Sequence, residues 1–342
     1  MFTEFTKTAA RRAPLYARLS AGIAADRALA GLLLTAPVTQ RQPVLLLGCV
    51  HDLLLAAPDG EELARYYPNL TVEPDLGDPV PAFGELCRRR SNELAELLRT
   101  RRTQTNEIGR CALLLPAFGL LADEVGLLAH LDVGTSAGLT LLLDKYRYVY
   151  EPGGELGADS PVTLTCGTRG RVPVPARVPA IGARRGIDPV PVDVNDEARA
   201  RWLEACVWPD QIDRFERLRA AIELARSTDL DVQFGDAVDD TAHHVCDLSA
   251  HGHPVVTNTW VLNYLSAEQR RAYVDVLDGV GRHTDLSWVY LESPHLTPEL
   301  PSPRGDPAVD GTVLVLVRWR AGQRTVDHLA DAHPHGYWLK WT

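Results

Sequence analysis

Leu127 to Asp144, LLAHLDVGTSAGLTLLLD, is the stretch that decides the predicted fold of this chain. An apolar run ends at Asp132, a loop of small residues follows from Gly134 to Gly138, and a second apolar run begins at Leu139. This order predicts a buried strand, a tight turn and a helix. The two glycines permit left-handed backbone angles and close approach of another molecule. Free N–H groups at the start of the helix would face that molecule, so the loop and Asp132 are predicted to cradle a small ligand.

The loop supports three interpretations. As D-x-G-x-x-x-G after a strand, it resembles the first motif of class I S-adenosylmethionine-dependent methyltransferases, whose glycines pack against the methionine part of the cofactor. As G-x-S-x-G, it also matches the nucleophile elbow of α/β-hydrolases, with Ser136 as the nucleophile. A third interpretation is a glycine turn that only closes a strand–helix unit. The context favours the methyltransferase, whereas NAD and FAD are disfavoured because the first two glycines of G-x-G-x-x-G are not both present.

Composition narrows the class of protein. The chain has 342 residues, of which 45% are hydrophobic and 23% charged, so it can form one large domain or two unequal ones. Its formal net charge of −10 argues against a nucleic-acid partner. The sequence shows neither a signal peptide nor an uninterrupted apolar window of about 18 residues, which predicts a cytoplasmic protein without a membrane partner. It predicts no particular oligomeric state.

Cysteine and histidine spacings favour no structural metal. The six cysteines are scattered without a C-x-x-C pair, as expected for reduced and mostly buried thiols. Three histidine pairs lie among turn residues without acidic or cysteine partners at metal-ligand spacing, and we interpret them as solvated loop histidines. These pairs are His243 with His244, His251 with His253, and His333 with His335.

The periodicity of apolar residues predicts two regions. Residues 1 to 122 are predicted to be a helical region that acts as a lid or contributes to substrate binding, with Leu15, Leu19 and Ile23 on one apolar face. Residues 123 to 342 alternate strands and helices, which predicts a Rossmann-like, doubly wound α/β domain with a mostly parallel sheet. Short β-prone segments predict an antiparallel insertion at about 146 to 180. Residues 312 to 319 and 337 to 341 are expected to end the domain as an antiparallel hairpin.

Acidic residues end three of the predicted strands. Asp132 ends the first, and Ala180 to Asp188 is the second, so that Asp188 takes the place from which a carboxylate binds ribose hydroxyls. Glu151 is its rival, because it lies at the usual interval of about 20 residues from the loop. Asp236 follows the third strand. Ligands of open α/β sheets bind outside the carboxyl ends of the strands, so the three acids together predict a binding crevice.

The segments LLAHLDVGTSAGLTLLLDKY, SPVTLTC, RRGID, WLEACVWPDQ, GDA and VVTNTWVLNYL, together with TNEIGRCALLLPA, resemble an uncharacterised bacterial domain-of-unknown-function family placed near class I methyltransferases. The resemblance covers nearly the whole chain. It implies S-adenosylmethionine as the cofactor, with Asp188 at the ribose and Asp236 and the Ala237 backbone at the adenine edge. The residues implied around the methionine part are Asp132, Gly134, Ser136 and Gly138, and those implied at the fourth strand's exit are Asn258, Thr259 and Trp260. Two departures from the common motif are Ser136 in place of a glycine and the late position of Asp188.

The function expected from this resemblance is methyl transfer from S-adenosylmethionine to an unidentified small molecule. The acceptor pocket is expected between the helical region and the strand ends. Its polar and aromatic candidates are His51, Asn106, Glu107, Arg110, Asn258, Trp260 and Tyr264. One alternative is a hydrolase with Ser136 as nucleophile, His295 as base and Asp236 as acid. Another is a Rossmann-like module that binds a ligand without catalysis.

Overall fold

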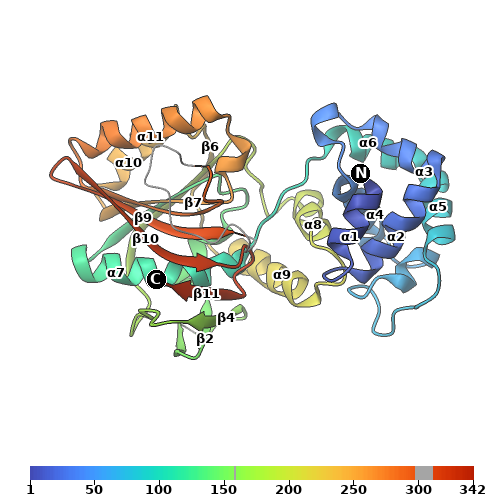
Figure 1. Cartoon of the computed structure of the whole chain (residues 1–342), viewed down its shortest axis with the longest axis horizontal. Coiled ribbons are helices and arrows are strands. Elements are labelled where there is room, and N and C mark those ends of the chain that lie inside the picture. Colours follow the sequence, from blue (N-terminus) through green and yellow to red (C-terminus); the bar gives the residue numbers. More distant parts are fainter. Residues whose placement is uncertain (158, 297–310) are drawn as a thin grey trace. The chain divides into compact units, whose positions relative to one another are not determined.

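The computed structural model describes residues 1–157, 159–296 and 311–342, and the chain divides into two compact units (Figure 1). The helical unit comprises Met1–Asn106 and Val194–Arg219, and the sheet unit comprises Glu107–Asp193 and Ala220–Thr342. The expected boundary at residue 122 falls inside α7 (Cys111–Val125). This helix belongs to the sheet unit because it packs against strands of the sheet.

The helical unit is built from α-helices joined by short 3₁₀ turns. Its helices are α1 (Phe2–Ala9), α2 (Pro14–Ala25), α3 (Arg27–Gly31), α4 (Pro43–Ala56), α5 (Val80–Arg89), α6 (Ser91–Thr100), α8 (Glu197–Ala205) and the first half of α9 (Ile212–Arg226). Its 3₁₀ turns are η1 (Leu32–Thr35), η2 (Val38–Gln40) and η3 (Glu62–Tyr66). The predicted face of Leu15, Leu19 and Ile23 is buried.

Packing around α4 explains why α8 joins this unit. The α4 residues are apolar apart from His51 and Asp52, which are also buried, and a helix of that kind must be surrounded by other elements. Trp202 and Ala205 of α8 belong to the same core cluster as the buried α4 side chains. The Trp202 indole N–H also donates to the Arg102 carbonyl at 2.8 Å. The sequence assigned this segment to the sheet domain because nothing in its own composition reveals the partner helix.

The sheet unit contains one mixed sheet of 11 strands in the described part of the chain, in the order β3-β2-β4-β11-β10-β9-β8-β7-β1-β5-β6. The strands are β1 (Leu128–Val133), β2 (Arg147–Glu151), β3 (Gly154–Gly157), β4 (Thr163–Arg169), β5 (Ile181–Asp188), β6 (Val232–Phe234), β7 (His253–Thr259), β8 (Leu286–Glu292), β9 (Thr312–Arg320), β10 (Gln323–Ala332) and β11 (Trp338–Trp341). Strands β6, β5, β1, β7 and β8 are mutually parallel. The α/β class and the mostly parallel sheet expected from the sequence are thus confirmed.

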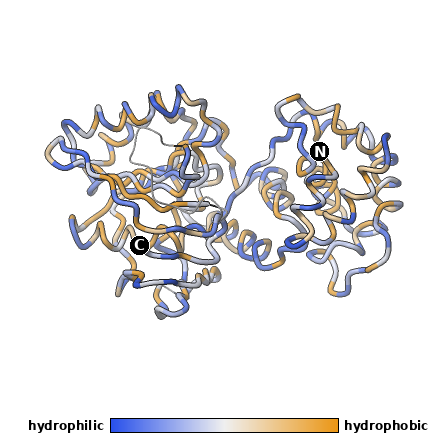
Figure 2. The backbone as a smooth tube through the Cα atoms, viewed as in Figure 1, coloured by the Kyte–Doolittle hydropathy of each residue, from blue (hydrophilic) through white to orange (hydrophobic). Residues whose placement is uncertain are grey.

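Helices cover both faces of the central strands. Figure 1 shows α10 (Thr241–Leu248) and α11 (Ala267–Gly281) on one side and α7 on the other. Leu131 of β1 and Tyr273 of α11 belong to one core cluster, whereas His130 of β1 contacts Phe118 of α7 edge to face. Figure 2 shows apolar residues along the central strands and an alternation of polar and apolar residues along α11. A capping box at Ser266 and Gln269 starts α11.

Two details of the predicted sheet are wrong. The segment near 146 to 180 is not a purely antiparallel insertion, because β2 pairs with β4 in parallel and only β2 and β3 are antiparallel. Strand β4 then pairs with β11, so these strands extend the main sheet. The final hairpin is formed by β9 and β10, and β11 pairs with β10. The sequence missed β10 because its first residues are polar and mostly exposed.

Candidate functional site

The strand order reverses at β1. This strand pairs with β5 on one side and with β7 on the other, both in parallel. The chain continues from β5 to β6 in one direction and from β7 to β8 in the other. We call the carboxyl ends of these five strands the carboxyl edge. A crevice for ligands is expected where the order reverses, next to the loop that follows β1.

The loop after β1 has three residues in the left-handed region. Gly134, Ser136 and Gly138 have φ of 83°, 54° and 72°. The expected cradle of free amides is not what the structure shows. Gly134 and Thr135 donate their N–H groups to the Ile187 carbonyl at 2.8 and 3.1 Å, and Gly138 donates to the Thr135 carbonyl. The following helix is also different, because η5 (Leu139–Lys145) is a 3₁₀ helix.

Close packing explains why the two loop positions are glycines. A Cβ atom on Gly134 would lie 2.5 Å from a methyl carbon of Val261, and one on Gly138 would lie 2.6 Å from a methyl carbon of Val232. Both positions also have left-handed angles that L-residues with side chains adopt only at a cost. The glycines therefore let the loop pack against Val261, which follows β7, and against Val232, the first residue of β6.

Asp132 is the centre of a buried hydrogen-bond network. It is 3% exposed, and its two carboxylate oxygens accept from the hydroxyls of Thr135 (2.8 Å) and Thr257 (2.7 Å). The Thr257 hydroxyl also lies 2.8 Å from Nε2 of His130. Burial raises the pKa of Asp132 to about 6, partly offset by the two threonine hydroxyls, and burial lowers the pKa of His130 to about 3. His130 is thus neutral at pH 7.

Asp188 lies against the loop, as the sequence predicted for the acid of the second strand. One of its carboxylate oxygens accepts the Ser136 N–H at 2.9 Å, and the other accepts the Val190 N–H at 2.8 Å. Its rival Glu151 ends β2, which six strands separate from β1 in the sheet order β2-β4-β11-β10-β9-β8-β7-β1. Asp188, and not Glu151, therefore lies beside the loop that follows β1.

Hydrogen bonds from Asp236 order the turn after β6, and the large apolar side chain at the end of β6 is exposed. One carboxylate oxygen of Asp236 accepts the N–H groups of Val238 (2.7 Å) and Asp239 (3.3 Å), which orders the turn. Ala237 is 8% exposed. Phe234 at the end of β6 is 77% exposed, although it is a large apolar side chain. The sequence analysis did not single out Phe234, because a phenylalanine within a strand normally faces the core.

The predicted acceptor residues at the exit of β7 have different roles. Asn258 is fully buried, and its side-chain oxygen accepts from Tyr273 (3.0 Å) and Trp288 (2.7 Å) while its amide donates to the Val133 carbonyl (2.9 Å). The Asn258 side chain therefore joins neighbouring strands to α11. Tyr264 is 70% exposed. Trp260 has φ 59° and donates its indole N–H to the Thr312 hydroxyl at 3.0 Å.

Glu292 ends β8 and was missed by the sequence analysis. It is fully buried, and Oε1 accepts the N–H groups of Val261 (2.6 Å) and Leu262 (3.1 Å). Its other oxygen has no hydrogen-bond partner among the described residues. Burial raises the pKa of Glu292 to about 7, although the backbone N–H groups oppose the shift. No local pattern distinguishes it from a surface glutamate, because its strand neighbours decide its burial.

Glu107 and Arg110 belong to η4 (Ile108–Arg110) and its cap, at the start of the sheet unit. Arg110 donates to the carbonyls of Thr259 (2.8 Å) and Pro334 (2.9 Å). Oε2 of Glu107 lies 3.3 Å from Nδ1 of His335. These two predicted residues therefore lie near the end of β7, and the structure adds His335, which the sequence analysis had interpreted as a solvated histidine.

Comparison with known protein families identifies the family of this chain. A family model described as "Uncharacterized protein conserved in bacteria (DUF2332)" matches residues 1–341. The chain belongs to DUF2332. A search of curated proteins found no match. The expectation of an uncharacterised bacterial family is confirmed, whereas its nearness to methyltransferases remains a proposal.

Other predicted residues of this DUF2332 chain lie in the helical unit. His51 on α4 is fully buried, with Nδ1 3.1 Å from the Ala205 carbonyl and Nε2 2.9 Å from the Asn69 amide. Burial lowers its pKa to about 4. His51 is thus a neutral histidine in the core of the helical unit. Asn106 is the last residue of the first segment of this unit.

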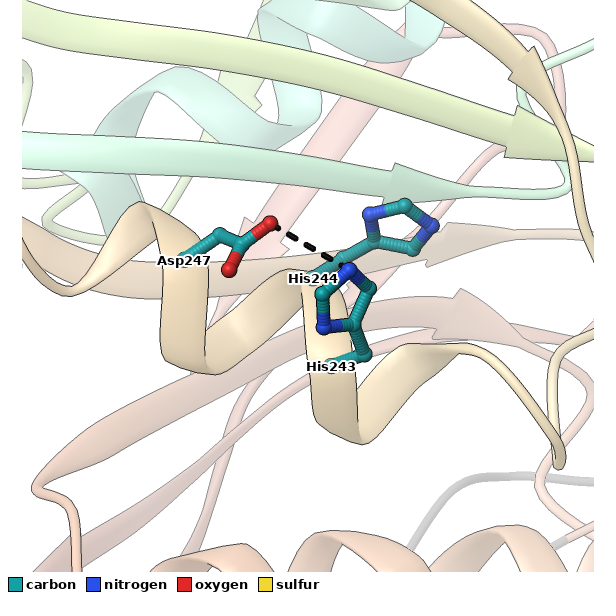
Figure 3. A group of neighbouring side chains, drawn as sticks. All are labelled: His243, His244 and Asp247. Carbon is teal, nitrogen blue, oxygen red and sulfur yellow. Dashed lines mark ion pairs between the residues drawn. The ribbon is translucent and has the colours of Figure 1, made fainter.

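Three side chains on α10 lie close enough to hold a metal ion, namely His243, His244 and Asp247. Figure 3 shows them together, with Nε2 of His243 3.4 Å from the Asp247 carboxylate. The Arg185 guanidinium, however, lies 3.1 Å from Nδ1 of His244 and 3.3 Å from the Asp247 carboxylate. A resident cation already neutralises the group, so the cluster gives little support for a metal site.

In the described parts of the DUF2332 chain, none of the helices combines the length and apolar character that crossing a membrane requires.

Proposed function

We propose that this DUF2332 protein is an S-adenosylmethionine-dependent methyltransferase that acts on a small molecule. The observation that carries the proposal is the position of Asp188, which ends the strand next to β1 and accepts an amide of the glycine loop. A Rossmann-like, doubly wound arrangement is the finer description of the sheet that this proposal requires. The reversal of strand order at β1 supports it.

The groups at the carboxyl edge fit an adenosyl cofactor. Asp188 is partly exposed and offers carboxylate oxygens to ribose hydroxyls. The exposed ring of Phe234 offers an apolar surface for an adenine ring, and Asp236 lies two residues beyond it. Asp132 lies next to the same loop, and its buried carboxylate is suited to an ammonium group. In the described part of the chain, the acids Asp188 and Asp236 lie at this edge, and acidic groups favour an adenosyl group over a phosphate-bearing cofactor.

In the proposed mechanism, S-adenosylmethionine supplies an electrophilic methyl group. The protein holds the acceptor's lone pair in line with that carbon, and this orientation contributes much of the rate increase. The carboxylate of Asp188 fixes both the loop and the ligand, so that their relative position is set before the acceptor binds. Packing of Gly134 against Val261 keeps the loop from shifting.

Replacing Asp188 by alanine is expected to weaken binding of S-adenosylhomocysteine at least about tenfold, because the ligand loses hydrogen bonds to a charged group. Isothermal titration calorimetry on the wild type and on Asp188→Ala measures this loss. Glu151→Ala is the matched control and is expected to bind like the wild type. Absence of binding by the wild type at high micromolar ligand would rule out the proposed function. Unchanged binding by Asp188→Ala would remove Asp188 from the site.

The hydrolase alternative has one observation in its favour, since the left-handed backbone of Ser136 is typical of an elbow nucleophile. Two features oppose it. Ser136 follows the first strand of the sheet, and the segment after it is the 3₁₀ helix η5 where an elbow needs an α-helix. His295, the base of that alternative, is exposed. We expect a fluorophosphonate probe to leave Ser136 unlabelled in intact-mass spectra. Stoichiometric labelling that disappears in Ser136→Ala would reverse the order of the two functions.

Measuring turnover distinguishes an enzyme from a module that binds the cofactor without catalysis. It would bind S-adenosylmethionine in the calorimeter without forming S-adenosylhomocysteine with any acceptor.

A further inference from the structure

Glu292 is the last residue of β8, and its carboxylate holds the segment that follows the neighbouring strand β7. The side chain is fully buried. Oε1 accepts the N–H groups of Val261 at 2.6 Å and of Leu262 at 3.1 Å. Oε2 has no hydrogen-bond partner among the described residues. We call residues 260–262 the β7 turn, and within the described chain the carboxylate therefore accepts hydrogen bonds from this turn alone.

The β7 turn has a backbone conformation that needs support. Trp260 has φ of 59°, in the left-handed region that residues with bulky side chains rarely adopt. Such a conformation costs free energy and persists only where surrounding contacts hold it. The Trp260 N–H donates to the Leu291 carbonyl at 2.9 Å, and its indole N–H donates to the hydroxyl of Thr312, the first residue of β9. Together with Glu292, these contacts hold the β7 turn to both β8 and β9.

The Val261 side chain connects the β7 turn to residues 134–138, which we call the glycine loop. A Cβ atom on Gly134 would lie 2.5, 2.6 and 3.1 Å from three carbons of Val261, so this side chain lies directly over Gly134. Because protein interiors are close-packed, a shift of Val261 must be followed by Gly134 or leave a gap. The residue whose N–H is bound by Glu292 is thus the residue that sets the position of Gly134.

The glycine loop is held from both strands that neighbour β1. On the β5 side, the Ile187 carbonyl accepts two N–H groups of the loop, and the Asp188 carboxylate accepts the Ser136 N–H at 2.9 Å. On the β7 side, Val261 packs against the loop. Since β1 lies between β5 and β7, a loop released on the β7 side can move relative to Asp188. The contact with Val261 therefore affects the position of the proposed cofactor site.

We propose that Glu292 is a positioning residue, which acts through Val261 to fix the glycine loop relative to Asp188 before the cofactor binds. This inference rests on the proposed methyltransferase function. Glu292 itself is fully buried, so its effect on the ligand passes through the β7 turn. A loop that is ordered in advance spares the ligand the entropic cost of ordering it, and Glu292 therefore increases affinity for the cofactor without touching it.

Glu292→Leu removes the acceptor of the two N–H groups. The variant is expected to fold, because leucine has a similar volume and the substitution also removes a buried charge. Its affinity for S-adenosylhomocysteine, measured by calorimetry, is expected to fall about tenfold, since the ligand must now order the loop. Glu292→Gln keeps an oxygen for the N–H groups and is expected to restore the affinity to within about threefold of the wild type. Wild-type affinity in Glu292→Leu would overturn the inference.

A double-mutant cycle tests whether Glu292 acts through Val261. Val261→Ala removes the methyl groups over Gly134 and alone is expected to weaken binding about fivefold. Unchanged binding would overturn the inference even if Glu292→Leu failed to fold. The double variant is expected to bind within about twofold of the weaker single variant, whereas losses that multiply in full would show that Glu292 acts by another route. Val162→Ala, a buried valine before β4, is the matched control and is expected to bind like the wild type.

Hydrogen exchange of the ligand-free protein observes the loop directly. The amides of Gly134 and Thr135 are expected to exchange at least about fivefold faster in Glu292→Leu than in the wild type, while those of β4 exchange alike. If the wild type binds S-adenosylhomocysteine but the loop amides of Glu292→Leu exchange at wild-type rates, the inference fails and the proposed function stands. If the wild type does not bind the ligand, the proposed function fails and the inference fails with it.

Discussion

Replacing Asn258 by leucine is expected to lower the free energy of unfolding of the sheet unit by about 4 kcal/mol, because three buried partners lose their hydrogen bonds at about 1 to 3 kcal/mol each. The partners are the Tyr273 hydroxyl, the Trp288 indole N–H and the Val133 carbonyl. Leucine has a similar volume, so the loss comes from stranded polar groups and not from a cavity. Hydrogen exchange of the β7 amides across a urea series measures it.

Tyr264→Ala is the control for this prediction. Tyr264 lies only six residues further along the chain but is 70% exposed, so its replacement is expected to change the free energy of unfolding by less than about 0.5 kcal/mol. If Asn258→Leu is as stable as the wild type but loses S-adenosylhomocysteine binding, Asn258 is a ligand residue, as the sequence first indicated, and its structural role is wrong.

The second large effect is a pH dependence of stability that Glu292 creates. Burial raises the pKa of this carboxyl from its ordinary value of 4.5 to about 7 in the folded protein. Below pH 4.5 the group is protonated in both states and costs nothing. Between pH 4.5 and pH 7 the unfolded chain releases the proton more readily, so stability falls as the pH rises. The loss is complete above pH 7 and amounts to roughly 3 kcal/mol, since one pKa unit corresponds to about 1.4 kcal/mol.

Asp132 contributes in the same direction, with a pKa raised from 3.8 to about 6. Glu292→Gln isolates the Glu292 part, because glutamine keeps an oxygen for the N–H groups of Val261 and Leu262 and does not ionise. The variant is expected to match the wild type at pH 4 and to exceed its free energy of unfolding by up to about 3 kcal/mol at pH 7.5. Urea unfolding at a series of pH values gives both curves.

Glu268→Gln removes an exposed carboxylate in the first turn of α11 and is the matched control. Its pH profile is expected to run parallel to that of the wild type. Parallel profiles for Glu292→Gln and the wild type would contradict the burial of an ionised Glu292.

The sequence by itself determined those parts of the fold that local patterns encode. The apolar run that ends at Asp132 located β1, and the segment from Ala180 to Asp188 located β5. The same patterns placed Asp132 and Asp188 at strand ends, because the end of an apolar run marks the end of a strand. Parallel strands bring their carboxyl ends to one edge, so the neighbourhood of these two acids could be predicted before any contact was known.

Only the tertiary structure decided the rest, because it depends on partners far apart in the chain. Packing of Trp202 beside α4 assigned α8 to the helical unit. Strand pairing made the polar segment β10 the second strand of the final hairpin. Three partners supplied by distant segments made Asn258 a buried link, and burial from all sides raised the pKa of Glu292. Glu107 and His335 became neighbours because Gly109 packs closely against the backbone of His335 and Gly336, and a side chain's own sequence context does not contain such a contact.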